Sequence, residues 1–183
     1  MKQESNVRYI LRLALTLLVI CAVVSALLAG VNAITKDRIA AIQQEKIDQA
    51  LLQVQPDASG LKKQELSGDT GIVTALYASG NHYAVEVKPA GFDGPITMMV
   101  GITDGKVIGI SIVSHTETPG LGAVAAADSA KGEAFRNQFA GLVSGIVVDG
   151  EDNSIDSMSG ATITSKAVAA GVNAALEFVA NLG

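Results

Sequence analysis

The feature that most constrains this chain is an uncharged apolar run near its N-terminus. Residues Leu13–Val31 read LALTLLVICAVVSALLAGV, 19 residues without a charged side chain. At a helical rise of about 1.5 Å per residue, such a run has about the length needed to cross the ~30 Å hydrocarbon core of a bilayer. The run therefore predicts a transmembrane helix over residues 13–34.

A cleaved signal peptide is the alternative interpretation of this run. Val31-Asn32-Ala33 resembles the small-residue cleavage site that ends such peptides. However, the run is longer than the ~7–15 apolar residues of a signal peptide, so we favour a retained anchor.

The distribution of charge predicts how the anchor is oriented. Residues 1–35 carry Lys2, Arg8 and Arg12 against Glu4, whereas the remaining residues carry 10 basic and 17 acidic side chains. Because basic flanks of membrane helices stay in the cytoplasm, we expect a cytoplasmic N-terminus over residues 1–12. The acidic remainder would then lie on the extracytoplasmic (periplasmic) side of the inner membrane, behind a single span.

Composition excludes several classes of function. A net charge of -5 argues against a nucleic-acid partner, because nucleic-acid binders normally carry a basic patch. One cysteine excludes an internal disulfide, a four-cysteine zinc site and a cysteine-ligated iron–sulfur cluster. With only two histidines we expect no metal site. Redox chemistry in this chain would therefore need an organic cofactor.

The segment after the apolar run predicts a stalk. Residues 36–54 place apolar side chains at three- and four-residue steps, which predicts an amphipathic helix that Pro56 and Gly60 end. Residues 57–70 are polar and are typical of a linker. We therefore expect a stalk helix and linker over residues 35–70.

The rest of the chain predicts one α+β domain over residues 71–183, with antiparallel strands and flanking helices. Four runs rich in Val, Ile, Thr and Tyr are separated by turn signals: Gly71–Ala78, His82–Lys88, Pro95–Ile102 and Lys106–Val113. The Asp104-Gly105 pair between the last two is a strong hairpin signal. Beyond them we expect a helix ending near Phe139, a strand over Leu142–Val148, an acidic loop and a final helix from about Thr164 to Leu182.

The loop Ser114–Gly122, which reads SHTETPGLG, has two interpretations. It could be an ordinary connection in which Pro and Gly form turns. It could also approach a cofactor closely, because its glycines expose backbone N–H groups while Glu117 and Thr118 supply polar side chains. Gly120–Ala125 also fits a permissive dinucleotide pattern, but it does not directly follow a strand, so we disfavour a Rossmann site.

A second motif, Asp156–Thr162 (DSMSGAT), leads directly into the final helix. One interpretation is a Ser/Thr-rich cap for that helix. The other is a phosphate site, because free N–H groups and the positive dipole end of a helix stabilise an anion. Thr164 or Ser165 is the better candidate for the cap, because the apolar stripe of the helix starts at Val168. A threonine of this segment that is esterified to a phosphate would be electrostatically well placed at the start of the helix.

Together, these residues resemble a known family. Asp156-x-x-Ser159-Gly160-Ala161-Thr162 resembles the flavinylation motif of proteins that carry FMN through a threonine phosphoester. With the ETPGLG loop and the anchor, the chain is similar over its whole length to the G subunit of the Rnf ion-translocating electron-transport complex. The C subunit of the sodium-translocating NADH:quinone reductase shares this FMN-binding domain and is an alternative assignment.

The resemblance implies a role for each matching residue. Thr162 would bear covalent FMN, and a separate flavin transferase, using FAD and a divalent metal, would recognise its neighbours Asp156, Ser159, Gly160 and Ala161. The other loop would lie against the flavin through four residues: Glu117, Thr118, Gly120 and Leu121. No residue is implied to be catalytic or to bind a metal.

The resemblance also implies a function for the whole chain. It would be an electron relay in a lipid-embedded complex of several membrane subunits, which couples electron flow between ferredoxin and NAD to ion translocation. Two other functions stay open. A cofactor-free, membrane-anchored binding domain would leave Thr162 unmodified, and a stand-alone flavin reductase lacks a visible nicotinamide site.

Overall fold

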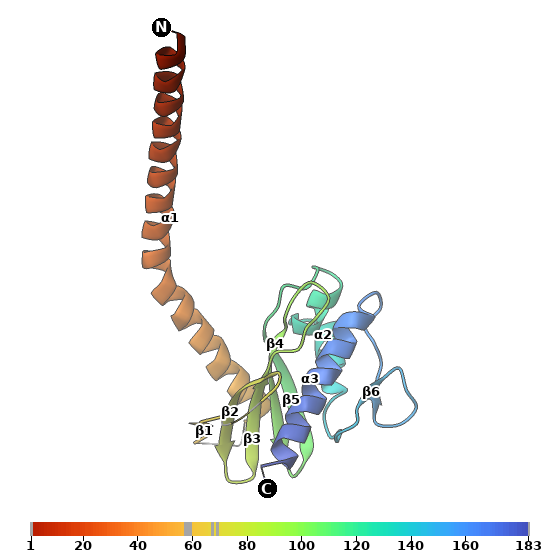
Figure 1. Ribbon diagram of the computed structural model, residues 1–183. Coiled ribbons are helices and arrows are strands. Elements are labelled where there is room, and N and C mark those ends of the chain that lie inside the picture. Colours follow the sequence, from red (N-terminus) through yellow and green to blue (C-terminus); the bar gives the residue numbers. More distant parts are fainter. Residues whose placement is uncertain (1, 57–59, 67, 69, 183) are drawn as a thin grey trace. The chain divides into compact units, whose positions relative to one another are not determined.

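The computed structural model describes residues 2–56, 60–66, 68 and 70–182, and the chain divides into two compact units, Met1–Glu45 and Lys46–Gly183 (Figure 1). Helix α1 (Lys2–Val54) supplies all of the first unit that is described and the start of the second. The second unit contains two β-sheets and the remaining helices. Each unit is described by itself below.

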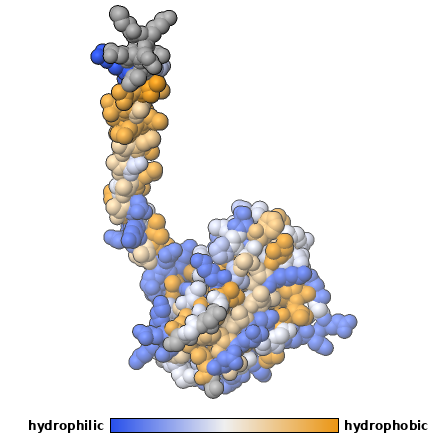
Figure 2. Space-filling view, in the orientation of Figure 1, coloured by the Kyte–Doolittle hydropathy of each residue, from blue (hydrophilic) through white to orange (hydrophobic). Residues whose placement is uncertain are grey.

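The helix of the first unit is long and apolar enough to cross a membrane. Its leucine, valine and isoleucine side chains between Ile10 and Val31 are about half exposed or more, with no core around them. Figure 2 shows these hydrophobic residues along the helix. A helix that is apolar on every side has no polar face to turn toward water, which is the pattern of a membrane-spanning segment.

The centre of the second unit is a five-stranded antiparallel sheet. Its order is β1-β2-β3-β4-β5, with strands β1 (Lys62–Gln64), β2 (Val73–Ser79), β3 (His82–Val87), β4 (Thr97–Thr103) and β5 (Lys106–Ser114). The four strands expected from the sequence are therefore confirmed, and each joins the next in chain order. At the tip of the β4–β5 hairpin, Asp104 and Gly105 have φ of 53° and 71°, as a turn that matches the strand twist requires.

One face of the sheet is covered by helix α3 (Thr162–Ala180), with α2 (Ala130–Asn137) and the 3₁₀ helix η1 (Gly122–Ala126) at one end (Figure 1). The apolar stripe of α3 meets inward-facing strand residues in one core. Its fully buried members include Val85, Val87, Met98, Val100, Ile102, Phe139, Val168 and Val172. Gly171 lets α3 approach the sheet, because a Cβ there would lie 3.0–3.2 Å from Pro89, Met98 and Val87.

The last turns of α1 pack on the opposite face of the sheet. Val54 is fully buried there, in a cluster with Ala50, Ala75, Tyr77, Ala84 and Met99. The buried Gln55 fixes the end of this helix, because its amide donates to the Tyr83 and Ile102 carbonyls at 3.2 and 3.0 Å. This segment therefore contributes to the core of the second unit.

The structure differs from the sequence expectations in three places. Strand β1 lies inside the range expected to be a linker, and it pairs with β2. The compact second unit begins at Lys46, within the range expected to be a stalk. The strand expected over Leu142–Val148 shrinks to β6 (Val147–Val148), which pairs in parallel with β7 (Ser154–Ile155).

The third difference has a local cause. Gly145 has a φ of 88°, which interrupts an extended strand, and the Asn173 side chain on α3 takes the place of a neighbouring strand. Its Oδ1 accepts the N–H groups of Gly145 and Ile146 at 3.0 and 2.8 Å, and its Nδ2 donates to the Ile146 carbonyl.

Candidate functional site

Three segments far apart in the sequence meet around one cavity beside the start of α3. They are the turn after Pro89, the loop after β5, and the first turn of α3 with the residues before it. The cavity has a volume of about 360 Å³ and is lined by Phe92, Glu117, Thr118, Leu121, Gly122 and Gly160–Thr164. Phe92, Leu121 and Ile163 are exposed apolar side chains at its rim, with 66%, 45% and 55% of their surface accessible.

Glu117 connects these three segments. Its side chain is 5% exposed, and its Oε1 accepts the N–H groups of Phe92 and Asp93 at 2.8 and 3.2 Å. Its Oε2 accepts the hydroxyl of Thr164 at 2.5 Å. The backbone N–H of Glu117 in turn donates to Nδ1 of His115 at 3.2 Å. A carboxylate can accept several hydrogen bonds and donate none, so these contacts suit it.

The rest of this loop is exposed and turns tightly. Gly120 has a φ of 78°, in the left-handed region that favours glycine. The Thr118 carbonyl accepts the N–H groups of Leu121 and Ala123, both at 3.2 Å, so the loop closes on itself before η1 begins. The turn brings Leu121 against Gly160, where a Cβ would lie 3.1 Å from a Leu121 methyl group.

The motif that precedes α3 is held by hydrogen bonds to the rest of the domain. Gln138 pairs with the backbone of Asp156, accepting its N–H at 2.7 Å and donating to its carbonyl at 3.4 Å. Asp149 accepts the N–H of Ser157 at 2.7 Å, and Ser165 accepts that of Met158 at 3.0 Å. The segment is thus fixed in front of the helix.

The Asp149 contact also changes the acidity of that side chain. The pKa of Asp149 lies below its ordinary value, mainly because the backbone N–H of Ser157 stabilises the ionised form. A hydrogen bond from the Ser157 side chain and the nearby charge of Lys166 lower it further.

Thr162 is the first residue of α3, and it is exposed beside the cavity. Our expectation that Thr164 or Ser165 caps this helix is wrong. The N-cap is Ala161, whose side chain has no hydrogen-bonding group, and the helix begins two residues earlier than expected. Thr164 and Ser165 lie inside the first turn, 2% and 0% exposed, because Glu117 and the Ala161 carbonyl accept their hydroxyl groups.

The structure brings six of the nine expected site residues to this cavity: Glu117, Thr118, Leu121, Gly160, Ala161 and Thr162. The other three, Gly120, Asp156 and Ser159, line a neighbouring cavity of about 360 Å³ that shares Leu121. Sequence reasoning missed Phe92, Gly122, Ile163 and Thr164. Of these, Phe92 had a detectable signal, since it is a large apolar residue in a glycine-flanked turn.

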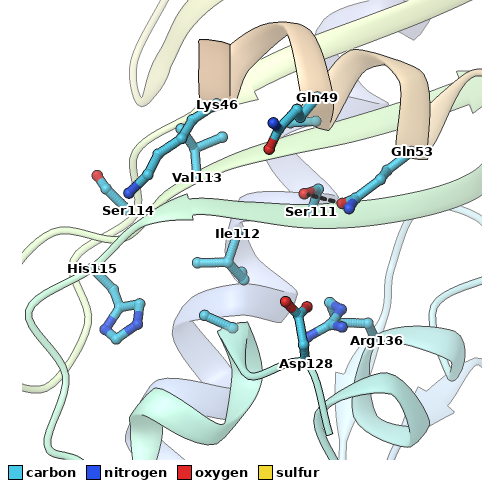
Figure 3. A pocket seen from close by; sticks show the side chains of 12 residues that line it. Lys46, Gln49, Gln53, Ser111, Ile112, Val113, Ser114, His115, Asp128 and Arg136 are labelled. Atoms are coloured by element: carbon cyan, nitrogen blue, oxygen red, sulfur yellow. Dashed lines mark hydrogen bonds between the residues drawn. The ribbon is translucent and has the colours of Figure 1, made fainter. Parts of the chain in front are cut away.

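A separate cavity of about 420 Å³ lies between the last turns of α1 and strand β5 (Figure 3). Lys46, Gln49 and Gln53 enter it from α1, and Ser111 donates to Gln53 at 2.7 Å. His115 lines this cavity and accepts the Glu117 N–H, so the two sites adjoin through one short segment. No residue of the Asp156–Thr162 motif lines this cavity.

Comparisons with known proteins identify the family of this chain. Residues 91–177 match the family model of the FMN-binding domain, and residues 1–54 match that of the RnfG N-terminal region. Residues 91–177 are thus an FMN-binding domain by family match, and they follow an N-terminal helix. The chain belongs to the family of G subunits of ion-translocating oxidoreductase complexes.

Relatives of this chain come from several organisms. The chain is 30% identical to the G subunit of the ion-translocating oxidoreductase complex of Methanosarcina acetivorans, over 96% of this chain and 97% of that protein. It is 29% identical to the G subunit of the Na(+)-translocating ferredoxin:NAD(+) oxidoreductase complex of Acetobacterium woodii, over 99% and 97%. The G subunit of a proton-translocating ferredoxin:NAD(+) oxidoreductase complex from Clostridium ljungdahlii is 47% identical over 53% of this chain and 52% of that protein.

A solved structure shares the fold. The C subunit of the Na(+)-translocating NADH-quinone reductase from Parabacteroides distasonis superposes with a TM-score of 0.54 at 18% identity, covering 77% of this chain and 94% of that one. The α+β arrangement of an antiparallel sheet with flanking helices is therefore confirmed.

Proposed function

We propose that this chain is the flavin-carrying member of a membrane-bound, ion-translocating ferredoxin:NAD oxidoreductase complex, with FMN attached to Thr162 through a phosphoester. The observation that carries the proposal is the position of Thr162. An exposed hydroxyl at the first residue of a 19-residue helix opens beside a cavity with an apolar rim. The family match and the names of the relatives support the setting in a complex.

The residues present fit both halves of FMN. The first turn of α3 has no side-chain cap at Ala161, so its N–H groups and dipole would stabilise a phosphate by about 0.3–1 kcal/mol if exposed. The apolar rim formed by Phe92, Leu121 and Ile163 fits a planar aromatic ring, and the cavity volume is within the range of cofactor pockets. When bound, the flavin would accept and release one or two electrons.

Within this function, the protein binds and orients the cofactor. The covalent bond would keep FMN on the extracytoplasmic side, where free flavin would be lost by diffusion. The helix Lys2–Val54 would anchor the domain in the lipid bilayer beside the other membrane proteins of the complex, with residues 1–12 in the cytoplasm. A flavin transferase would recognise Asp156, Ser159, Gly160 and Ala161 and transfer FMN from FAD to Thr162. The bond from the Thr162 Oγ to the FMN phosphorus would form as the pyrophosphate bond of FAD breaks, with AMP as the leaving group and the hydroxyl proton released.

Intact-mass spectrometry tests the attachment. The full chain is co-expressed with a flavin transferase, and its mass and in-gel flavin fluorescence are measured after denaturation. We expect one FMN on the natural chain, none on Thr162→Ala, and some on Thr162→Ser, which keeps a hydroxyl. Ser157→Ala is the control, because it removes a neighbouring hydroxyl outside the motif positions.

Two outcomes would contradict the assignment. Fluorescence that survives in Thr162→Ala would move the attachment to a neighbouring hydroxyl. A natural chain that stays colourless with an unmodified Thr162 would favour a cofactor-free, membrane-anchored binding domain. The same mass also reports whether the apolar N-terminal segment is retained or removed after Ala33.

A further inference from the structure

Glu117 is a buried acidic side chain in the wall of the cavity, and its carboxylate is hydrogen-bonded to other parts of the protein. Oε1 of Glu117 accepts two backbone N–H groups and Oε2 accepts the Thr164 hydroxyl. Among the described residues, no buried side-chain nitrogen or oxygen atom lacks a hydrogen-bond partner. The resemblance places Glu117 directly against the flavin, but these contacts direct its carboxylate to the protein.

The space around the carboxylate is closed by two glycines. A Cβ at Gly91 would overlap Oε1 of Glu117 and lie 2.8 Å from the Gly94 carbonyl. A Cβ at Gly122 would overlap Oε2 and lie 2.5 Å from the Thr164 hydroxyl. The three connected segments therefore pack on this one group without room for another side chain.

Thr164 links Glu117 to the first turn of α3, which carries the proposed attachment residue Thr162. Thr162 and Thr164 are two residues apart, so they point to roughly opposite sides of the helix. Thr164 is buried against Glu117, and this contact fixes the rotation of the first turn. Thr162 is then left exposed at the cavity.

We propose that Glu117 is a positioning residue: through Thr164 and the Phe92 turn it holds the cavity and Thr162 in place, and its fixed negative charge lowers the reduction potential of a flavin bound there. This inference rests on the proposed function. Glu117 lines the cavity, and a negative charge in the cavity wall opposes the addition of electrons to a nearby ring.

The chain contains a matched control for this contact. Thr74 donates to Glu86 at 2.5 Å, the same pair of residue types at the same distance, but on the sheet and away from the cavity. The variants Glu117→Gln and Glu86→Gln each remove one negative charge with little change of shape. Thr164→Val and Thr74→Val each remove one hydroxyl, and Thr164→Ser restores the hydroxyl at the site.

Two measurements are made on the full chain. The midpoint potential of the attached flavin is expected to shift to more positive values in Glu117→Gln and to stay unchanged in Glu86→Gln. The rate of FMN attachment, followed by intact mass with FAD, a divalent metal and purified flavin transferase, is expected to fall several-fold in Thr164→Val. Thr164→Ser is expected to recover it, and Thr74→Val to match the natural chain.

The apo protein gives a third readout, which does not depend on flavin. The thermal midpoint is expected to fall more in Thr164→Val than in Thr74→Val, because only the first leaves a buried carboxylate oxygen without its donor. Equal potentials in the two Gln variants, or Thr164→Val and Thr74→Val that behave alike in both assays, would overturn the inference. A natural chain that takes up no FMN would instead contradict the proposed function, and the apo comparison would still test the contact.

Discussion

Val54, the last residue of helix α1, lies directly over Gly101 in strand β4. A Cβ at position 101 would overlap the Val54 carbonyl oxygen and lie 2.9 Å from its carbonyl carbon and from its Cβ. Gly101 pairs across the sheet with Gly109 of β5, so the two glycines form a flat seat for the end of the helix. The seat is what allows the final turns of a long helix to become part of the domain core.

The close approach of Val54 to Gly101 predicts the effect of adding a side chain at position 101. Gly101→Ala should destabilise the domain by about 1–3 kcal/mol, the usual cost of overpacking, because the clash is with backbone that cannot rotate away. Urea unfolding followed by tyrosine fluorescence measures it. Gly109→Ala is the control, since a Cβ there has only Val54 Cα within 4 Å, at 4.0 Å. A similar loss of stability in both variants would contradict the explanation.

Two glycines of the loop after β5 should respond differently to alanine. At Gly122 a Cβ would overlap the Glu117 carboxylate, so Gly122→Ala should separate the segments around the cavity and reduce FMN attachment several-fold. At Gly120 a Cβ has open space, and only the φ of 78° is unfavourable, at about 1–2 kcal/mol. Gly120→Ala should therefore lose stability but still take up FMN. The reverse order of attachment would refute this assignment.

The Asp149–Ser157 contact predicts a dependence on pH. The pKa of Asp149 is lower in the folded domain than its ordinary value of about 3.9. The contribution of this carboxylate to the stability of the folded domain is therefore complete at pH values above about 3.9. The contribution is lost as the pH falls through the lowered pKa, when the carboxylate that holds the Ser157 N–H is protonated.

Hydrogen exchange of the Ser157 amide measures this effect. Protection should be constant from neutral pH to about pH 4 and fall below it, after correction for intrinsic exchange. In Asp149→Asn the protection should not depend on pH across this window. If the Ser157 amide of the natural chain is equally protected above and below about pH 4, the Asp149–Ser157 hydrogen bond does not hold the motif in place.

Membrane orientation is a prediction from Lys2, Arg8 and Arg12 beside the apolar helix. A reporter that is active only in the cytoplasm, fused after Gly183, should be inactive, and one that is active only outside should work. Replacing the three basic residues with glutamine and adding lysines after the helix should reduce this preference. Strong activity of the cytoplasmic reporter on the natural chain would reverse the topology.

Sequence alone determined the features that depend on neighbouring residues. The run Leu13–Val31 predicts a membrane helix because its length and lack of charge are properties of the segment itself. The Asp104-Gly105 turn and the alternation around it predicted the hairpin, since positive φ and strand twist are set locally. The motif ending at Thr162 could be found for the same reason.

Tertiary structure decided what each of these residues contacts. Glu117 and Thr164 are 47 positions apart, and no local pattern indicates that one accepts the hydroxyl of the other. No local pattern indicates that Gly101 lies beneath Val54. Nor does one indicate that Thr164 and Ser165 lie inside the helix, where they do not act as its N-cap. Such contacts arise when the sheet and α3 pack together, because burial forces each polar group to find a partner wherever the fold supplies one.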